Sequence, residues 1–348
     1  MIKRTIIDAC IFMQLLNPRK VYNYFKYGVW GDGIKLEASS ACQLRCPSCA
    51  TVAPKGKSVF EKTVGKGFLK FDDFKKIIDA NPWIKTVEIS NWGEIFLNPE
   101  LQQIIEYGNK KRVLLAANNG VNLNRISEEQ IECLVKNKFK HLTVSIDGAS
   151  NETYQIYRKG GNFDVVIANI KKINHYKQKY NTRFPTLNWQ FVIFGHNEHE
   201  LPIARQMAKE LNMKFIPKLN SQAPWNPDYS PVKNKEFVRK QSGFRTASRQ
   251  EFEQKEKRNY NQPCNQIWFA PQVNWDGKLL GCCHNIYADF GNVFEQGLSN
   301  LLKRGEKYQY AKKMLAGKVS PRKDIACSSC HRYKYRSIPK LFKWMAGK

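Results

Sequence analysis

Six short apolar runs alternate with helical segments between residues 34 and 217, and this alternation limits the folds open to the chain. The runs are rich in β-branched residues, while the segments between them repeat apolar residues at helical spacing. Strands that alternate with helices form parallel sheets with right-handed crossovers. The sequence therefore predicts an α/β fold, a partial (β/α)6 TIM-like barrel. Its expected strands are Ile34–Ala38, Thr86–Ser90, Val113–Ala117, Leu142–Ile146, Leu187–Phe194 and Lys214–Pro217.

Polar motifs follow these runs at the points where strands should end. In barrels of this kind, chemistry gathers at the carboxyl ends of the strands. A cysteine loop follows the first run, Gly93-Glu94 the second, Asn118-Asn119-Gly120 the third and Asp147-Gly148 the fourth. We therefore expect one site at this end of the barrel. The expected helices between the runs are Phe71–Asp79, Pro99–Lys110, Ser127–Lys136, Phe163–Tyr180 and Glu198–Leu211.

Three cysteines, Cys42, Cys46 and Cys49, lie in the loop Cys-Gln-Leu-Arg-Cys-Pro-Ser-Cys. Three thiolates at this spacing can hold three irons of a cubane iron–sulfur cluster and leave the fourth iron without a protein ligand. The alternative is a structural zinc site, but zinc takes four ligands and no nearby His or Cys supplies the fourth. The spacing favours a cluster with one open coordination position.

A second group of cysteines lies near the carboxyl end. Cys264, Cys282, Cys327 and Cys330 could close a four-thiolate site for zinc or for a [4Fe–4S] cluster. Cys283 is the alternative to Cys282. The spacing of five residues from Gly277 favours Cys282. Asp276-Gly277 predicts a β-hairpin between Trp268–Val273 and Lys278–Gly281. A site with four cysteine ligands has no open iron, which favours electron transfer or a structural role.

The net charge is +27, from 57 Lys and Arg against 30 Asp and Glu. Basic and aromatic residues mix at 3–26 and 332–348, which suits an anionic membrane surface or an anionic substrate. No RNA-binding motif appears, so we do not expect a nucleic-acid partner. No signal peptide is visible, and clustered cysteines favour metal ligation in a reducing compartment. We expect a cytoplasmic protein that can contact the inner face of the membrane peripherally.

Changes in composition divide the chain into five expected parts. Residues 1–33 form a basic amphipathic segment and residues 34–217 the barrel. Residues 218–262 read as a charged linker with one helix near 249–258. A small cysteine domain of hairpin and helices follows at 263–335, and 336–348 form a basic tail.

Together these motifs resemble the radical S-adenosylmethionine (radical SAM) superfamily, over roughly residues 34–335. The resemblance rests on the three-cysteine loop, on Ser90-Asn-Trp-Gly-Glu94, and on Ser145-Ile-Asp-Gly148 followed by Arg158. The tail cysteines look like the family's auxiliary-cluster domain, of the SPASM type or its shorter twitch form. With no cysteine beyond Cys330, we expect one auxiliary [4Fe–4S] cluster.

The resemblance also implies a chemistry and a set of contacts. A [4Fe–4S] cluster on the cysteine loop binds SAM, and one electron cleaves SAM to methionine and a 5′-deoxyadenosyl radical. Glu94 would accept a hydrogen bond from the methionine ammonium, and Gly93 would let the backbone approach SAM. Ser145 and Asp147 match contacts to the ribose or methionine end, and Arg158 matches a partner of the SAM carboxylate. Asn119 is a further candidate for SAM binding.

The resemblance implies a radical enzyme, and the substrate stays open. An auxiliary cluster suggests a two-electron oxidation, or a rearrangement, of a sugar-type or anionic metabolite. A maturase that modifies a ribosomally made peptide is one alternative, and a non-catalytic iron–sulfur electron carrier is another. The expected partners are a small-molecule, glycan-type or peptide substrate and an electron donor such as flavodoxin or ferredoxin. The catalytic base or hydrogen donor is left unassigned.

Overall fold

Seven parallel strands form one sheet in the order β6-β5-β4-β3-β2-β1-β7. The computed structural model describes residues 17–220, 226, 229–257, 260, 264–330 and 333. Six strands confirm the runs expected from the sequence, and the seventh comes from the carboxyl-terminal region. The strands are β1 (Gly33–Leu36), β2 (Thr86–Glu88), β3 (Leu114–Val121), β4 (His141–Ser145), β5 (Thr186–Ile193), β6 (Met213–Leu219) and β7 (Gln272–Val273).

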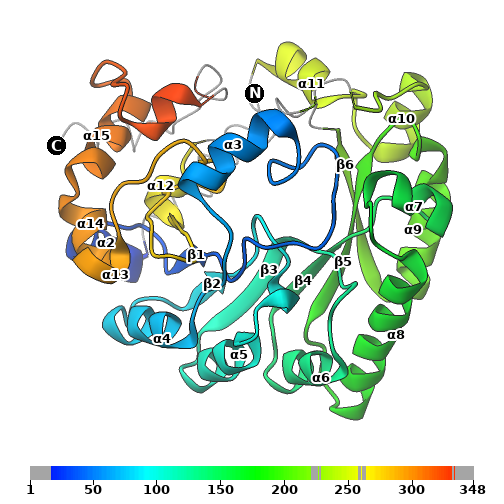
Figure 1. Cartoon of the computed structure of the whole chain (residues 1–348), viewed down its shortest axis with the longest axis horizontal. Coiled ribbons are helices and arrows are strands. Elements are labelled where there is room, and N and C mark those ends of the chain that lie inside the picture. The colour runs from blue at the N-terminus through cyan, green and yellow to red at the C-terminus, as the bar shows by residue number, and fades with distance from the viewer. Residues whose placement is uncertain are drawn as a thin grey trace.

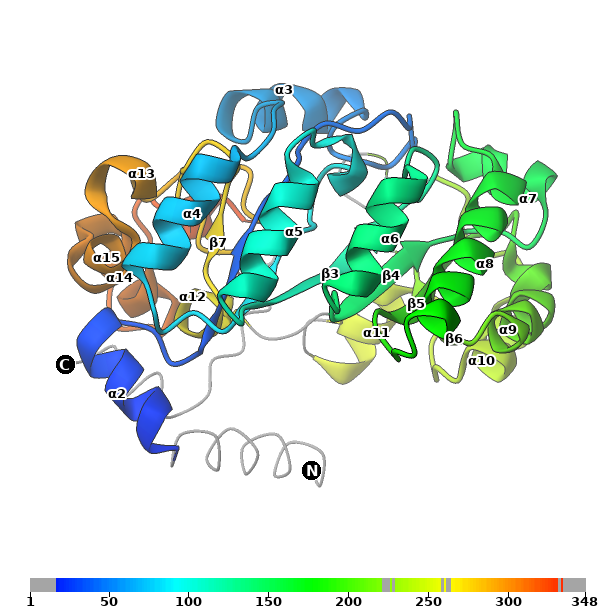
Figure 2. The same ribbon diagram turned by 90° about the horizontal axis from the view of Figure 1, so that it is seen from below.

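Five amphipathic helices cover the outer face of the curved sheet (Figure 1, Figure 2). Each buries apolar residues at helical spacing, as Phe74, Ile77 and Ile78 do in the first of them. Some expected boundaries differ from the helices by a few residues; Ser127, for example, is the N-cap of a helix that begins at Glu128. The helices are α4 (Phe71–Ala80), α5 (Leu101–Lys110), α6 (Glu128–Lys136), α8 (Phe163–Lys179) and α9 (Leu201–Glu210).

Alternation along the strands separates an apolar outer face from a polar inner face. Leu142 and Val144 of β4 are buried in the core under the helices. The residues between and after them, Thr143 and Ser145, therefore face the inside of the curved sheet. By strand register, the same inner face carries Lys35, Glu88, Asn188, Gln190, Ile216 and Lys218.

Helices outside this pattern were mostly missed from sequence. The sequence predicted one helix in 218–262, and α11 confirms it, but α10 precedes it and buries Val238. The segment is therefore more structured than a linker. The other helices are α2 (Pro18–Tyr27), α3 (Pro54–Thr63), α7 (Asn151–Tyr157), α10 (Lys235–Ser242), α11 (Arg249–Glu256), α12 (Gln266–Phe269), α13 (Val293–Gln296), α14 (Leu298–Arg304) and α15 (Glu306–Leu315), with the 3-10 helices η1 (Ile95–Leu97), η2 (Glu198–Glu200) and η3 (Ala326–Ser329).

The amino-terminal segment was expected to precede the barrel. Its last residues pack into the hydrophobic core. Val29 and Trp30 are buried, and the Trp30 ring stacks on Tyr24 of α2 at 4.6 Å between ring centroids. Residues 1–16 of this segment and the basic tail 336–348 lie outside the described residues. No helix of the described residues is long and apolar enough to span a membrane.

The carboxyl-terminal region adds β7 beside β1 and then turns back. Trp268 was expected in the first hairpin strand, but it lies in α12, so this strand is shorter than predicted. The Asp276-Gly277 turn is confirmed: Gly277 has a φ of 85°, which favours glycine, and Val273 bridges Leu279 in antiparallel register. The region thus continues the barrel sheet and packs against its open edge.

Candidate active site and auxiliary cluster site

The cysteine loop leaves β1 and is held by the segment that follows β2. The backbone N–H groups of Gly93 and Glu94 donate to the carbonyl oxygens of Ser39 and Ala41, at 3.1 and 2.8 Å. A Cβ on Gly93 would lie 2.4 Å from the Ser39 oxygen, so only glycine fits this crossing. Glycine is therefore needed at position 93 because the chain passes close to the backbone of the cysteine loop. The sequence did not reveal this reason.

Each thiol of the loop has one polar neighbour, and the three neighbours come from three different parts of the chain. Asn122 Nδ2 lies 3.9 Å from Cys42 Sγ, and Arg158 Nη1 donates to Cys46 Sγ at 3.7 Å. The hydroxyl of Thr51 lies 3.0 Å from Cys49 Sγ. Donors of this kind stabilise thiolates, so the surroundings of the three sulfurs suit metal ligation.

Burial disfavours the thiolate form of two of these residues, Cys42 and Cys46. It raises the pKa of Cys42 to about 12 and that of Cys46 to about 11, while the Arg158 charge opposes the shift at Cys46. Because thiolates are the metal ligands, iron must displace these protons. The cationic neighbour lowers the cost of that exchange.

Arg158 is fixed by a buried ion pair. Its Nε donates to Asp147 Oδ2 at 2.6 Å, and Asp147 is fully buried. The other carboxylate oxygen, Oδ1, accepts from the backbone N–H of Val192 at 2.7 Å. Burial raises the pKa of Asp147, and the Arg158 charge opposes this. Asp147 thus holds Arg158 toward Cys46, and its expected contact with SAM stays a prediction.

Glu94 lies almost fully buried beside the cysteine loop. Its carboxylate accepts from the backbone N–H groups of Asn122, at 2.5 Å, and Phe96, at 3.4 Å. Burial raises the pKa of Glu94 to about 7, and these hydrogen bonds and the Arg158 charge lower it. Asn122, which the sequence did not single out, connects Glu94 to Cys42.

Two other residues expected at the site have partners within the protein. Ser145 Oγ accepts from Gln190 Nε2 at 3.4 Å on the inner face. Asn119 Nδ2 donates to the carbonyl oxygen of Ser90 at 2.8 Å and to Asn91 Oδ1 at 3.2 Å. Asn119 thus supports the segment after β2, while Ser145 lies among the polar residues of the inner face.

Glu37 is a buried carboxyl group that sequence reasoning missed. Its Oε1 accepts from the backbone N–H of Trp92 at 3.0 Å, and its Oε2 is buried without a hydrogen-bond partner in the described structure. Burial raises the pKa of Glu37 to about 8. The available signal was a charged residue inside the apolar run Ile34–Ala38.

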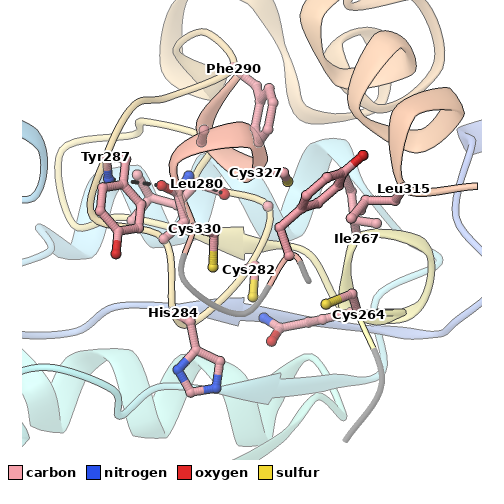
Figure 3. Close-up of a pocket in the computed structure, with 15 residues that line it drawn as sticks. Cys264, Ile267, Leu280, Cys282, His284, Tyr287, Phe290, Leu315, Cys327 and Cys330 are labelled. Carbon is pink, nitrogen blue, oxygen red and sulfur yellow. Dashed lines mark hydrogen bonds between the residues drawn. The ribbon is translucent and has the colours of Figure 1, made fainter. Parts of the chain in front are cut away.

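The four expected tail cysteines line one pocket of about 530 Å³, its open mouth included (Figure 3). Much of the remaining lining is apolar, including Ile267, Leu280, Phe290 and Leu315. In that view the imidazole of His284 points away from the sulfur atoms. The pocket is therefore a mainly apolar, partly open place where four thiols could bind a metal centre: Cys264, Cys282, Cys327 and Cys330.

The neighbouring Cys283 does not belong to the lining of this pocket. Its backbone N–H donates to Gln266 Oε1 at 3.2 Å, and its carbonyl oxygen accepts from Asn91. This supports Cys282 over Cys283 as the ligand. No three Cys, His, Asp or Glu side chains of the described residues are grouped so that they could hold a metal ion. A cubane cluster binds each thiolate at a separate iron atom. Four thiols distributed around one pocket therefore suit a cubane cluster better than a single metal ion.

The two thiol sites are joined by direct contacts. Asn91 Nδ2 donates to the Cys283 carbonyl oxygen at 3.1 Å, and Trp275 Nε1 donates to the Val64 carbonyl oxygen at 2.9 Å. A separate apolar cluster spans both sides of this contact. Its members are Ala50, Phe60, Val64, Leu280 and Ile286, with Val59, Trp92 and Tyr287 packed against them.

Comparison with known proteins gives two family matches. Residues 36–206 match the radical SAM superfamily, and residues 264–331 match the SPASM iron–sulfur cluster-binding domain. A curated relative, the AdoMet-dependent heme synthase of Methanosarcina barkeri, is 30% identical over 182 residues, which are 51% of this chain and 47% of the relative. The chain thus aligns with about half the length of that relative.

Solved structures of low sequence identity share the fold. Streptococcus suis SuiB bound to S-adenosylmethionine has a TM-score of 0.63 at 14% identity, over 91% of this chain and 75% of SuiB. SuiB has also been solved bound to the precursor peptide SuiA. The protein anSMEcpe with bound AdoMet has a TM-score of 0.54 at 15% identity, over 90% of this chain and 95% of its own. The chain therefore belongs to the radical SAM superfamily and carries a carboxyl-terminal SPASM iron–sulfur domain.

Proposed function

We propose that this radical SAM enzyme carries out a two-electron oxidation of a sugar-type or anionic metabolite. The proposal depends on the hydrogen bond from Asn91 to the Cys283 carbonyl oxygen. Asn91 belongs to the segment that supports the cysteine loop, and Cys283 adjoins the auxiliary pocket. An oxidation needs an acceptor for its second electron, and a linked auxiliary site suits that role. In a rearrangement the substrate radical would keep this electron, so no contact between the two thiol sites would be needed.

The two thiol sites would hold the cofactors. When bound, a [4Fe–4S] cluster on the cysteine loop supplies the electron that cleaves SAM, and one auxiliary [4Fe–4S] cluster accepts an electron from substrate oxidation. Loss of a hydrogen atom, a proton and this electron converts an alcohol to a carbonyl group. Flavodoxin or ferredoxin would supply the reducing electron. Four pocket cysteines, Cys264, Cys282, Cys327 and Cys330, support a single auxiliary cluster.

The chain's own residues would bind and orient SAM. Backbone N–H groups hold the Glu94 carboxylate in place, so that it can accept from the methionine ammonium. The Arg158 guanidinium has five N–H donors, of which Asp147 and Cys46 take two. The others remain able to pair with the SAM carboxylate. Ser145 lies on the inner face, where it can contact the ribose or methionine end.

A peptide maturase is the second candidate. SuiB is described with a precursor peptide, and the fold similarity to SuiB covers 91% of this chain. A peptide substrate would occupy the same inner face of the sheet. The two candidates differ in the product that a substrate screen would yield.

The test begins with anaerobic enzyme loaded with iron and sulfide. With dithionite and SAM it should form 5′-deoxyadenosine, and SAM should change the electron paramagnetic resonance spectrum. A screen of phosphorylated sugars and sugar acids should then yield a product lighter by two hydrogens. Modified peptides from a peptide screen would favour the maturase instead. Full iron loading without 5′-deoxyadenosine would favour an electron carrier and contradict the proposal.

Peripheral contact with an anionic membrane also remains a proposal. On α2, Phe25 is 69% exposed and Tyr22 54% exposed, and Lys26 lies beside Tyr22. Exposed aromatic rings with cations suit the lipid interface. Flotation with phosphatidylglycerol vesicles should recover the protein at moderate salt, and pure phosphatidylcholine should not. Failure to float with either lipid would remove this part.

A further inference from the structure

Two lysines on the inner face of the sheet have no partner for their ammonium groups. Lys35 of β1 and Lys218 of β6 are partly buried, and neither Nζ makes a hydrogen bond or ion pair with any residue the structure describes. Lysines on the outer helices do pair, as Lys75 does with Asp79 at 2.7 Å. Neither ammonium nitrogen is itself buried, so each can take an anion that is supplied from outside.

Lys218 lies within electrostatic reach of both thiol sites. Burial is the main reason that its pKa falls to about 8. The like charges of Arg249 and Lys35 lower it further, whereas Asp147 and Cys283 raise it. Asp147 belongs to the SAM site, and Cys283 adjoins the auxiliary pocket. The Lys218 ammonium therefore lies near charged groups of both sites, and Lys35 lies on β1 beside Gln272 of β7, which joins the barrel to the auxiliary region.

The acidic groups near these lysines are already engaged. Glu88 accepts from the Asn118 N–H at 2.8 Å and from Ser90 Oγ at 2.7 Å. Asp147 is paired with Arg158. Glu37 has a pKa raised to about 8 by burial and is mostly neutral at neutral pH. None of the three lies within ion-pair distance of Lys35 or Lys218.

We propose that Lys35 and Lys218 bind an anionic group of the substrate, a phosphate or a carboxylate, on the inner face between the two thiol sites. Ammonium groups act as compact point charges toward such oxygens. Strand register places both lysines on the inner face, and they are close enough for the charge of Lys35 to act on Lys218. This inference rests on the proposed function, because it names the group by which that substrate is recognised.

The test measures binding of a simple anion to the cluster-loaded enzyme. Calorimetric titration with inorganic phosphate, and in a second arm with acetate, is done at constant ionic strength to hold general screening fixed. The double variant K35Q/K218Q should weaken binding of at least one anion by about tenfold or more. Weaker binding of phosphate in the variant would indicate phosphate recognition, and weaker binding of acetate would indicate carboxylate recognition. The matched control K76Q/K110Q removes the same charge from two outer helices and should bind as the wild type does.

A second measurement does not depend on the variants folding. Wild-type enzyme is acetylated with and without the bound anion, and each lysine is followed by peptide mass spectrometry. The anion should protect Lys35 and Lys218 but not Lys110. Equal binding by wild type and K35Q/K218Q, loss of binding in the control, or no protection would each overturn the inference. Failure of the proposed function would instead appear as missing 5′-deoxyadenosine in the wild type.

Discussion

The cysteine loop and the auxiliary pocket place thiols in contrasting surroundings. Three loop thiols come from eight consecutive residues, and Asn122, Thr51 and Arg158 give each a polar neighbour. The pocket thiols come from separated segments and lie among mainly apolar residues. A polar, three-thiol site can hold a ligand at a fourth metal position, whereas an apolar, four-thiol site cannot. The difference predicts that SAM chemistry depends on one site and the second electron on the other.

The largest expected effects come from removing one thiol at each site. Cys46→Ala should abolish 5′-deoxyadenosine formation, because the first cluster loses a ligand. Cys327→Ala should keep SAM cleavage but lose substrate oxidation. With one [4Fe–4S] cluster at each site, as proposed, the iron content should fall by up to about half in each case. Iron analysis, spectroscopy and product chromatography together measure these changes.

Cys133→Ala is the matched control for both variants. Cys133 is buried on α6, where its thiol lies near the Gln102 carbonyl oxygen, far in sequence from both cysteine groups. It should keep full iron content and activity. If Cys327→Ala lost SAM cleavage as completely as Cys46→Ala does, the division of roles between the sites would be wrong.

The next effect concerns the buried pair at the first site. Arg158→Gln removes a positive charge beside Cys46, so the reduced cluster should be less stable and its midpoint potential lower. Loss of such a supporting contact commonly costs about 10–100-fold in activity. Redox titration followed by electron paramagnetic resonance should show the shift in the first cluster only. An equal shift in the auxiliary cluster would mean that the two sites are not electrostatically separate.

The sequence predicted the barrel closely because its signals are local. Each β-branched run became a strand, and the helical segments became the outer helices, with boundaries moved by a few residues. The missed helix α10 has a weaker signal, since charged and polar residues surround its single fully buried Val238. Trp268 read as the start of a strand, but its position in α12 depends on packing against the barrel.

The candidate site was predicted as a set of residues but not as a set of contacts. Cys42, Cys46 and Cys49 stand out by spacing alone. The Asp147–Arg158 pair depends on how the turn and α7 after β4 bring two residues together. The contact of Asn122 with Cys42 joins residues 80 positions apart. No local pattern encodes contacts of this kind, because they arise when separate strands align in the sheet.

A smaller effect concerns Glu37, whose carboxyl group accepts a hydrogen bond from the backbone N–H of Trp92 in the segment that holds the cysteine loop. Burial raises its pKa from the ordinary 4.5 to about 8. The folded protein therefore keeps a proton that the unfolded chain loses as the pH rises above 4.5. This contribution to stability is full below that pH and is lost progressively as the pH rises to about 8.

Glu37→Gln removes this titration and keeps an acceptor for the backbone. Between about pH 6 and 8.5 the melting temperature of the wild type should fall relative to the variant, by roughly 2–5 °C. Thermal unfolding of both proteins across this range measures the difference. Parallel pH profiles for the two proteins would show that Glu37 does not titrate in this window.

The smallest expected effect tests the contact between the two sites. Asn91→Ala removes the hydrogen bond to Cys283 and should lower the free energy of unfolding by about 1 kcal/mol. Because both clusters keep all their ligands, iron content should stay unchanged. The ratio of 5′-deoxyadenosine to oxidised product should rise, since the auxiliary site would be held less firmly beside the substrate.

Asn300→Ala supplies the control for this variant. Asn300 makes an exposed hydrogen bond to the Gln296 carbonyl oxygen at 3.3 Å, outside both sites. The Asn300→Ala variant should leave the product ratio unchanged and should change the free energy of unfolding very little. A ratio that stays at the wild-type value in Asn91→Ala would show that the apolar cluster alone, through Trp92 and Ile286, holds the sites together. The link would then depend on packing, and a Trp92→Ala variant would be the one that uncouples SAM cleavage from oxidation.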